Sequence, residues 1–422
     1  DTLAPDGRRA PPVPGDPSQP SLRVVRSGSW VGLGLAIQNV ASYAFAIAAA
    51  HLLGPAGYGA LAALMGLILV VNVVSLGLQA TVARRVALGV ADRASVERSA
   101  KRAARRAALA LAVVCLVASP LVARLLQLDS WVTAALLAVP AAAYAVLGAD
   151  AGLLQGEERW PAFAATFAAF GLARLGLGLV GVLVWPHPLG AMAGVAAGAV
   201  VPAVVAARAT RTRGPVNAAE ATDGRDIVGE AVHGSHTLLA FFALSSVDVI
   251  ASRTFLPAHE AGLYAAGTIL VKAVLFLPFI ITVLVFPALA RRGGRGRLHL
   301  LGLAGVLAVG AVVAAGVAVL PRVALVFVGG QAYAEITGLL WAFAAVGAGL
   351  AAIQLLVYTA LARQHPAAVW VLWGAVIVIV VGLVLGLADT APGLLALVAA
   401  VDVVTLLVLV WMTRADEDDP TR

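Results

Sequence analysis

The chain has 422 residues, of which 61% are hydrophobic and only 12% are charged, and its formal net charge is +7. Soluble domains carry about 25% charged residues, so this composition excludes an ordinary soluble protein. A positive net charge also fits a nucleic-acid partner. The placement of the charges, described below, instead favours contact with membrane headgroups, and we expect no nucleic-acid partner.

Long apolar segments, bounded by charged residues or by Gly and Pro, follow one another along the chain. About 20 apolar residues cross the hydrocarbon core, and such segments must be helices because lipid satisfies no backbone polar group. The predicted spans are 28–52, 58–80, 107–127, 131–153, 161–185, 187–207, 234–256, 262–288, 298–320, 334–358, 366–388 and 391–412. We therefore expect an all-α polytopic membrane protein with 12 transmembrane helices.

The two halves of the sequence resemble each other at an offset of about 205 residues. Gly57-Tyr58-Gly59-Ala60 recurs as Gly262-Leu263-Tyr264-Ala265, and Pro161 recurs as Pro366. A duplicated six-helix unit is a transporter architecture, with a substrate site where the repeats meet. Because each half has an even number of spans, the two lobes should share their orientation and be related by an axis along the membrane normal.

These repeats divide the chain into two lobes with polar flanks. The predicted parts are a disordered cytoplasmic tail (1–27), an N-terminal six-helix lobe (28–208), a cytoplasmic linker (209–232), a C-terminal six-helix lobe (233–413) and an acidic cytoplasmic tail (414–422). Glycines four residues apart let helices approach closely, and two such stripes occur, Gly28 with Gly32 and Gly190 with Gly194 and Gly198.

Basic residues outside the spans are distributed very unevenly between the two sides of the membrane. Twenty-four Lys and Arg lie on one side, whereas the other side has three, Arg124, Arg253 and Arg322. The positive-inside rule assigns the rich side to the cytoplasm, so both termini should be cytoplasmic and the protein multi-pass in the plasma membrane. The basic loops, above all Arg84–Arg106, should then meet anionic lipids, and that loop should extend the third helix.

The sequence has no catalytic motif. It lacks a phosphate-binding GxxxxGK[ST] loop, and no histidine pair has metal-ligand spacing backed by carboxylates. We therefore expect no enzyme activity, no cofactor and no metal. The single cysteine, Cys115, lies inside the third span and is expected to serve packing.

Three charged side chains inside the spans are the strongest candidates for function. Arg174, Asp248 and Lys272 lie roughly 20, 18 and 24 Å from the cytoplasmic ends of their spans, at 1.5 Å per residue, and so share one layer. A charge at the bilayer centre costs at least ~2.5–3.5 kcal/mol, so each needs a partner or a water-filled cavity. They either line a cavity or form a packing ion pair of Asp248 with one of the two cations. Two cations and one carboxylate suit an anionic substrate.

Other polar residues inside the spans are weaker candidates. Amides that either line the cavity or join helices are Gln38, Asn39, Asn72 and Gln354. Asp402 is either an ion-coupling carboxylate or an interhelix contact, whereas Asp150, at the end of the fourth span, is expected to be solvated.

Several motifs resemble the oligosaccharide flippase branch of the multidrug/oligosaccharidyl-lipid/polysaccharide exporter superfamily. They are His51-Leu52-Leu53-Gly54-Pro55-Ala56-Gly57-Tyr58-Gly59-Ala60, Thr81-Val82-Ala83-Arg84-Arg85, Gly152-Leu153-Leu154-Gln155-Gly156, Phe255 to Ala266, and Phe327 to Tyr333. The resemblance implies two six-helix lobes around a central cavity, and movement of a polyprenyl-pyrophosphate-linked saccharide to the outer leaflet. By the same resemblance, Asp248 matches an acidic position of the family, and Arg174 and Lys272 match positions that are often basic. It also makes a polysaccharide polymerase or glycosyltransferases candidate partners.

Three alternatives stay open at this point. A cation-coupled multidrug antiporter of the same superfamily would share the fold, but its carboxylates would form the functional core. A major facilitator carrier also has six plus six helices, yet Gly89-Val90-Ala91-Asp92-Arg93 lacks the basic continuation expected there. A non-transporting scaffold would have no reason to retain buried charges.

Overall fold

The structure is a computed structural model of the 422-residue chain. It describes residues 22–89, 93–211, 229, 236–275, 295–362 and 367–417. The second half of the predicted span 262–288, most of the linker 209–232 and the outer parts of both tails lie outside these ranges.

Every described element is helical, as apolar segments in lipid must be. The N-terminal lobe consists of α1 (Leu22–Val71), α2 (Val73–Ala87), α3 (Arg93–Leu125), α4 (Trp131–Ala135), α5 (Ala138–Gly156), α6 (Trp160–Val184) and α7 (Pro188–Thr210). The C-terminal lobe consists of α9 (His236–Phe255), α10 (Ala258–Leu275), α12 (Arg295–Val319), α13 (Pro321–Val328), the 3₁₀ helix η1 (Gly330–Leu339), α14 (Leu340–Ala362), α15 (Ala367–Val384) and α16 (Ala391–Glu417).

Helix α1 contains the first predicted span and the beginning of the second. At Gly54 the backbone leaves the helical region, with φ 65° and ψ 179°, a conformation that glycine adopts readily, and Pro55 follows. Beyond this break the helix continues through Asn72 into α2, since Asn72 donates to Ile68 and accepts from Leu76 in the backbone ladder.

The described chain contains ten helical stretches that are long and apolar enough to cross a membrane. One of them, Gly28–Ala87, combines two predicted spans, and α10 adds a further helix whose described part carries Glu260 and Lys272. The predicted class, an all-α membrane protein with twelve helices in two lobes, is confirmed.

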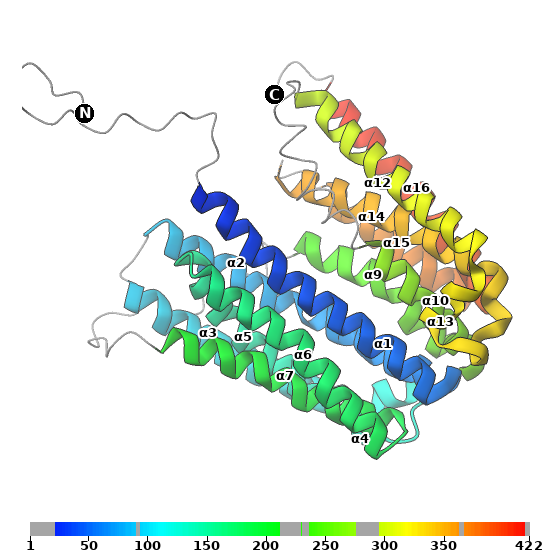
Figure 1. The fold of residues 1–422 in the computed structure, drawn as a ribbon, viewed down its shortest axis with the longest axis horizontal. Coiled ribbons are helices and arrows are strands. Elements are labelled where there is room, and N and C mark those ends of the chain that lie inside the picture. Colours follow the sequence, from blue (N-terminus) through cyan, green and yellow to red (C-terminus); the bar gives the residue numbers. More distant parts are fainter. Residues whose placement is uncertain are drawn as a thin grey trace, which may run out of the picture.

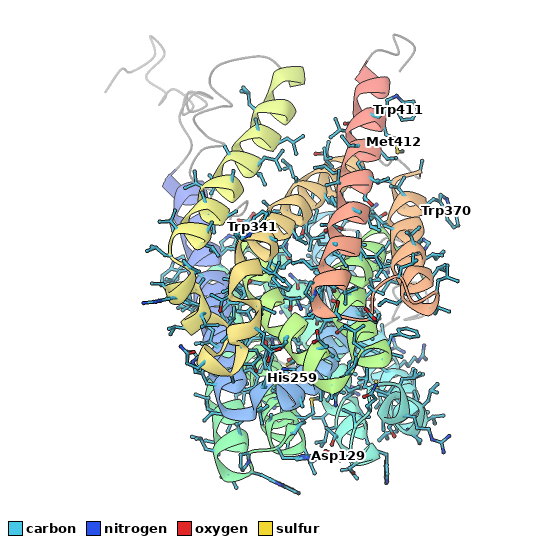
Figure 2. The ribbon with its side chains drawn as sticks, turned by 90° about the vertical axis from the view of Figure 1, so that its right-hand side faces the viewer. Asp129, His259, Trp341, Trp370, Trp411 and Met412 are labelled. Atoms are coloured by element: carbon cyan, nitrogen blue, oxygen red, sulfur yellow. The ribbon has the colours of Figure 1, made fainter. Side chains whose placement is uncertain are left out.

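Figure 1 shows the N-terminal lobe, in blue to green, beside the C-terminal lobe, in green to red. We call the end of the bundle where α1 begins and α16 ends the proximal end, and the other the distal end. Figure 2 shows Trp411 and Met412 toward the proximal end and Asp129 and His259 toward the distal end. The sequence predicts that the proximal end is cytoplasmic.

Glycine allows several of these helices to touch backbone to backbone. A Cβ atom at Gly194 would lie 2.1 Å from the carbonyl oxygen of Leu177, and one at Gly198 would lie 2.9 Å from that of Ala173, so the stripe packs α7 against α6 as predicted. The Gly28 and Gly32 stripe packs against none of the described residues, since a Cβ atom at either position would meet none of them within 4 Å.

The boundaries of the predicted flanks differ slightly from the helices. Helix α1 already begins at Leu22, inside the predicted tail 1–27, and α16 continues to Glu417, inside the predicted tail 414–422. Helix α3 begins at Arg93, so the basic segment extends the third helix as expected. Arg93 pairs there with Glu157, and with Glu97 at 3.0 Å, which anchors this extension to the end of α5.

The orientation in the membrane can be tested by labelling single cysteines in a Cys115→Ala background. Pro186 and Asp389 are exposed at the distal end, and Leu88 is 65% exposed at the proximal end. A membrane-impermeant thiol reagent should label cysteines at Pro186 and Asp389 in intact cells, but a cysteine at Leu88 only after permeabilisation. Labelling at Leu88 in intact cells would contradict the predicted orientation.

Candidate intramembrane charge site

The charged residues singled out from the sequence lie within electrostatic range of Lys272, in helices of both lobes. Lys272 lies in α10 of the C-terminal lobe, and the charges that act on it are those of Asp248, in α9, and Arg174, in α6 of the N-terminal lobe. The hydroxyl of Tyr43, in α1, donates to the backbone carbonyl of Lys272 and so joins the lobes at this level. The site is therefore built from four helices and both lobes.

Arg174 is held by aromatic residues of its own lobe. Its Nη2 donates to the hydroxyl of Tyr144 at 3.1 Å, and its guanidinium carbon lies 4.8 Å from the centre of the Phe170 ring, which stacks on Tyr144. A cation over an aromatic face is attracted by the ring quadrupole, so the charge is stabilised without being neutralised. Its Nε is buried and has no hydrogen-bond partner among the described residues.

Asp248 is 7% exposed and takes its hydrogen bonds from neutral donors. The hydroxyl of Tyr264 donates to Oδ2, and the backbone N–H of Val249 donates to Oδ1, each at 2.8 Å. Within the described chain, Asp248 forms no ion pair with Lys272 or Arg174 at the 4.0 Å limit for a salt bridge. The direct packing pair considered from the sequence is thus not formed, although the carboxylate still acts on Lys272 through space.

Asp402 belongs to the same group of intramembrane charges, although it lies far from the others in the sequence. It lies in α16, is 5% exposed, and its charge acts on both Asp248 and Tyr264. Its position inside a span signalled that it needs protein neighbours. The sequence could not show which ones, because α16 follows α9 by more than a hundred residues.

Two of the amide candidates lie on α1 near Arg174. The backbone of Gln38 packs directly on Gly171, one turn before Arg174 in α6, and its side-chain Oε1 is buried without a partner in the described chain. Asn39 instead donates to the carbonyl of Leu35, in the preceding turn of its own helix, at 2.6 Å. Gln38 is therefore the amide available to a ligand in this arrangement.

The other two amide candidates lie in α14 and at the junction of α1 and α2. Gln354, in α14, donates to the hydroxyl of Tyr358 at 3.4 Å. Gly347, in the same helix, contacts Val271, the neighbour of Lys272. Gln354 lies two turns beyond Gly347, roughly 10 Å closer to the proximal end. Asn72 lies at the junction of α1 and α2, where the helix continues, and its side chain makes no cap hydrogen bond.

Asp150 was predicted to be solvated, and this was wrong. Its side chain is 2% exposed and accepts a hydrogen bond from the hydroxyl of Thr210 at 3.0 Å, which ties α5 to the end of α7. The helices extend beyond the predicted span boundaries, so the residue lies between them and not at a free end.

The described residues of the two lobes are joined on the distal side of this site. The hydroxyl of Tyr333, in η1, donates to the carbonyl of Ala50, and Arg253 donates to the carbonyls of Leu126 and Gln127. A Cβ atom at Gly262 would lie 1.9 Å from the carbonyl oxygen of Pro55, so the lobes touch there backbone to backbone. These contacts close the site toward the distal end.

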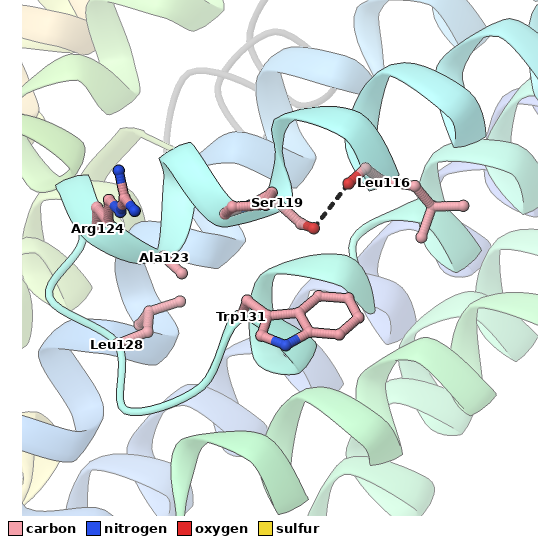
Figure 3. A pocket seen from close by; sticks show the side chains of 7 residues that line it. Leu116, Ser119, Ala123, Arg124, Leu128 and Trp131 are labelled. Atoms are coloured by element: carbon pink, nitrogen blue, oxygen red, sulfur yellow. Dashed lines mark hydrogen bonds between the residues drawn. The ribbon is translucent and has the colours of Figure 1, made fainter.

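A cavity of about 450 Å³ lies elsewhere, at the distal end of the N-terminal lobe. Figure 3 shows it between the last turns of α3, with Ser119 and Arg124, and Trp131 at the start of α4. It contains none of the intramembrane charges described above, so we do not place the central site there.

The hydrogen bond of Tyr264 should contribute measurably to stability. In Tyr264→Phe the buried Asp248 loses a donor, which should lower the free energy of unfolding by about 1–3 kcal/mol. The measurement is thermal unfolding of the purified protein in detergent. Tyr58→Phe is the matched control, because Tyr58 is 6% exposed and its hydroxyl makes no hydrogen bond between described residues. Equal effects of the two substitutions would contradict this role of Tyr264.

Solved structures with the same fold are transporters. A multidrug resistance transporter of the MATE family in an outward-facing conformation matches with a TM-score of 0.62 and 15% identity, over 96% of this chain and 97% of that chain. A eukaryotic MATE transporter matches with a TM-score of 0.55 and 14% identity, over 92% and 96% of the two chains. At these identities the similarity shows the fold alone.

A third structure is a transporter of the same superfamily from Pyrococcus furiosus, reported with a binding pocket of reversed polarity that suggests a different function. It matches with a TM-score of 0.57 and 15% identity, over 96% of this chain and 98% of that chain. No curated protein matches the sequence. The model of the polysaccharide biosynthesis protein family matches residues 24–292, well over half of the sequence, and the chain therefore belongs to that family.

Proposed function

We propose that this exporter moves a polyprenyl-pyrophosphate-linked oligosaccharide from the cytoplasmic to the outer leaflet of the plasma membrane, for cell-surface polysaccharide synthesis. The observation that supports this most directly is the pair of cations, Arg174 and Lys272, one from each lobe and close enough to act on each other. Membership of the polysaccharide biosynthesis family agrees with such a substrate.

Two like charges within electrostatic range of each other, one in each lobe, repel, and an anion bound between them removes the repulsion. A diphosphate carries several acceptor oxygens and can bind a guanidinium and an ammonium together through charge-assisted hydrogen bonds. The carboxylates of Asp248 and Asp402 lie on the C-terminal side of the site, whereas the described partners of Arg174, Tyr144 and Phe170, are neutral. The N-terminal face is thus the one that attracts an anion.

Unpaired polar atoms around the site support a ligand with both donors and acceptors. Within the described chain, Gln38 Oε1 and Arg174 Nε are buried and have no hydrogen-bond partner. Buried polar atoms normally find partners, and exceptions need an explanation. They lie in α1 and α6, where the backbone of Gln38 packs on Gly171, one turn before Arg174. A saccharide-diphosphate offers hydroxyl and phosphate oxygens to such atoms.

The same proposal includes the surroundings of the transporter. Both termini face the cytoplasm, where the lipid-linked saccharide is loaded, and the basic proximal loops contact anionic lipids. Glycosyltransferases that build the saccharide, and a polymerase that receives it, are the partners that such a flippase requires.

Removal of either cation should impair transport. In Arg174→Gln or Lys272→Gln a charge-assisted contact to the diphosphate is lost, which should weaken substrate affinity about 10- to 100-fold. The measurement is flipping of a lipid-linked saccharide in reconstituted vesicles, with protein abundance measured in parallel. Arg322→Gln, which removes an exposed distal cation, should transport normally.

Normal flipping in the Arg174→Gln/Lys272→Gln double variant would contradict the proposed site. Loss of the folded protein in both single variants, with full flipping by the fraction that remains folded, would instead assign the cations to packing.

A cation-coupled multidrug antiporter is the second candidate, because Asp402 lies within electrostatic range of Asp248 and Tyr264. Buried carboxylates in a membrane are typical of proton and ion pathways. This reading makes the carboxylates essential and Arg174 dispensable, the reverse of the flippase reading.

Asp248→Asn separates the two candidates. If the chain is a flippase, loss of this carboxylate should reduce flipping only partly, because Arg174 and Lys272 remain. If it is an antiporter, transport driven by an imposed proton or sodium gradient should disappear. The measurement is transport of a lipid-linked saccharide and of a cationic drug, with and without the gradient. Gradient-dependent drug transport that Asp248→Asn abolishes would overturn the flippase proposal.

A further inference from the structure

Helix α3 ends at the distal side in a way that leaves carbonyl groups free. Gln127 adopts a left-handed conformation, with φ 50°, and the backbone N–H of Leu128 bonds to Ala123 while that of Gln127 bonds to Arg124. This pattern ends a helix and satisfies carbonyls of the last turn, but not those of Leu126 and Gln127. These two lie at the negative end of the α3 dipole and attract a cation.

The cation that binds them comes from the other lobe. Arg253, in the last turn of α9, donates from Nε to the carbonyl of Leu126 at 2.9 Å and from Nη2 to that of Gln127 at 3.1 Å. The side chain is 6% exposed, although the sequence suggested a loop cation on the outer side. The planar guanidinium can reach two neighbouring carbonyls at once, which a single ammonium does less well.

The contact is satisfied only in part. Asp129, two residues beyond Gln127, adds an attractive charge, but it is 81% exposed at its side chain and also pairs with His187 at 2.9 Å. Nη1 of Arg253 is buried and has no partner in the described chain. A buried guanidinium held by two neutral acceptors and one screened carboxylate keeps part of its desolvation cost, so the closed contact is not strongly favoured over the open one.

We propose that Arg253 is a releasable latch between the lobes. It holds the distal end closed by capping α3, and it dissociates from the carbonyls of α3 when the exporter opens to the outside. It differs from the neighbouring Gly262–Pro55 contact, which is steric and uncharged. The proposal rests on the proposed transport function only in that the lobes must separate distally during a cycle. It does not depend on which substrate moves.

Distances between spin labels in the substrate-free protein, in lipid nanodiscs, test the latch. One label pair reports the distal ends, Pro186 with Asp389, and another reports the proximal ends, Leu88 with Trp411, in a Cys115→Ala background. Arg253→Met keeps an unbranched apolar stem in place of the arginine stem but removes both bonds. It should raise the distally open population on the order of tenfold, with longer distal and shorter proximal distances. Arg253→Lys should give an intermediate population.

Two control variants should behave like the wild type. Arg124→Met removes an exposed cation one turn away on α3, at the same end of the molecule. Gln127→Gly removes the side chain but keeps the left-handed conformation and both carbonyls. Unchanged distal distances in folded Arg253→Met would overturn the latch. If that variant does not fold, unchanged distances in Arg253→Lys would overturn it equally.

The readout needs no substrate, so its failure is distinct from failure of the flippase proposal. Wild-type protein that does not flip the lipid-linked saccharide would refute the substrate, whereas the label distances would still decide the latch.

Discussion

Charge in the middle of the membrane is the constraint on which the rest of this structure depends. A cation there cannot be left to lipid, so Arg174 is positioned by Tyr144 and Phe170 within its own lobe, while Lys272 sits within reach of Asp248 in the other. The close helix packing around them requires small residues, as where the backbone of Gln38 lies on Gly171. The glycine positions therefore determine how the charged helices approach one another.

The division of charge between the lobes has a mechanical consequence. Arg174 repels Lys272 across the interface, although Asp248 attracts Lys272 more strongly, whereas the Gly262–Pro55 contact and the capping of α3 by Arg253 hold the distal ends together. In the absence of an anion the two effects oppose each other. A bound diphosphate would remove the repulsion and change the balance between lobe arrangements, which is what a ligand with different affinities for two states does.

Much of the fold was predictable because lipid leaves few choices. Apolar length and charged boundaries predicted the twelve helices, and the motif repeated at Gly57 and Gly262 predicted two lobes. The two copies of this motif contact each other at the distal end. Glycine spacing alone was less reliable, since Gly190, Gly194 and Gly198 pack against α6 whereas Gly28 and Gly32 contact no neighbouring helix in the part of the chain that the structure describes. Spacing indicates which residues share a helix face, but only the neighbouring helix decides whether that face is covered.

The candidate site was predictable only in its charged members, since a buried charge is conspicuous in an apolar span and its neighbours are not. Tyr144, Tyr264 and Phe170 look like ordinary core residues in the sequence, yet they orient Arg174 and Asp248. Arg253 was misread for a related reason. It was counted among the basic residues outside the spans, but its partners are backbone carbonyls, which carry no sequence signal, and the left-handed conformation of Gln127 that exposes them is seen only in the structure. Contacts between a side chain and a helix end depend on the placement of whole helices, and so they become visible only once the lobes are assembled.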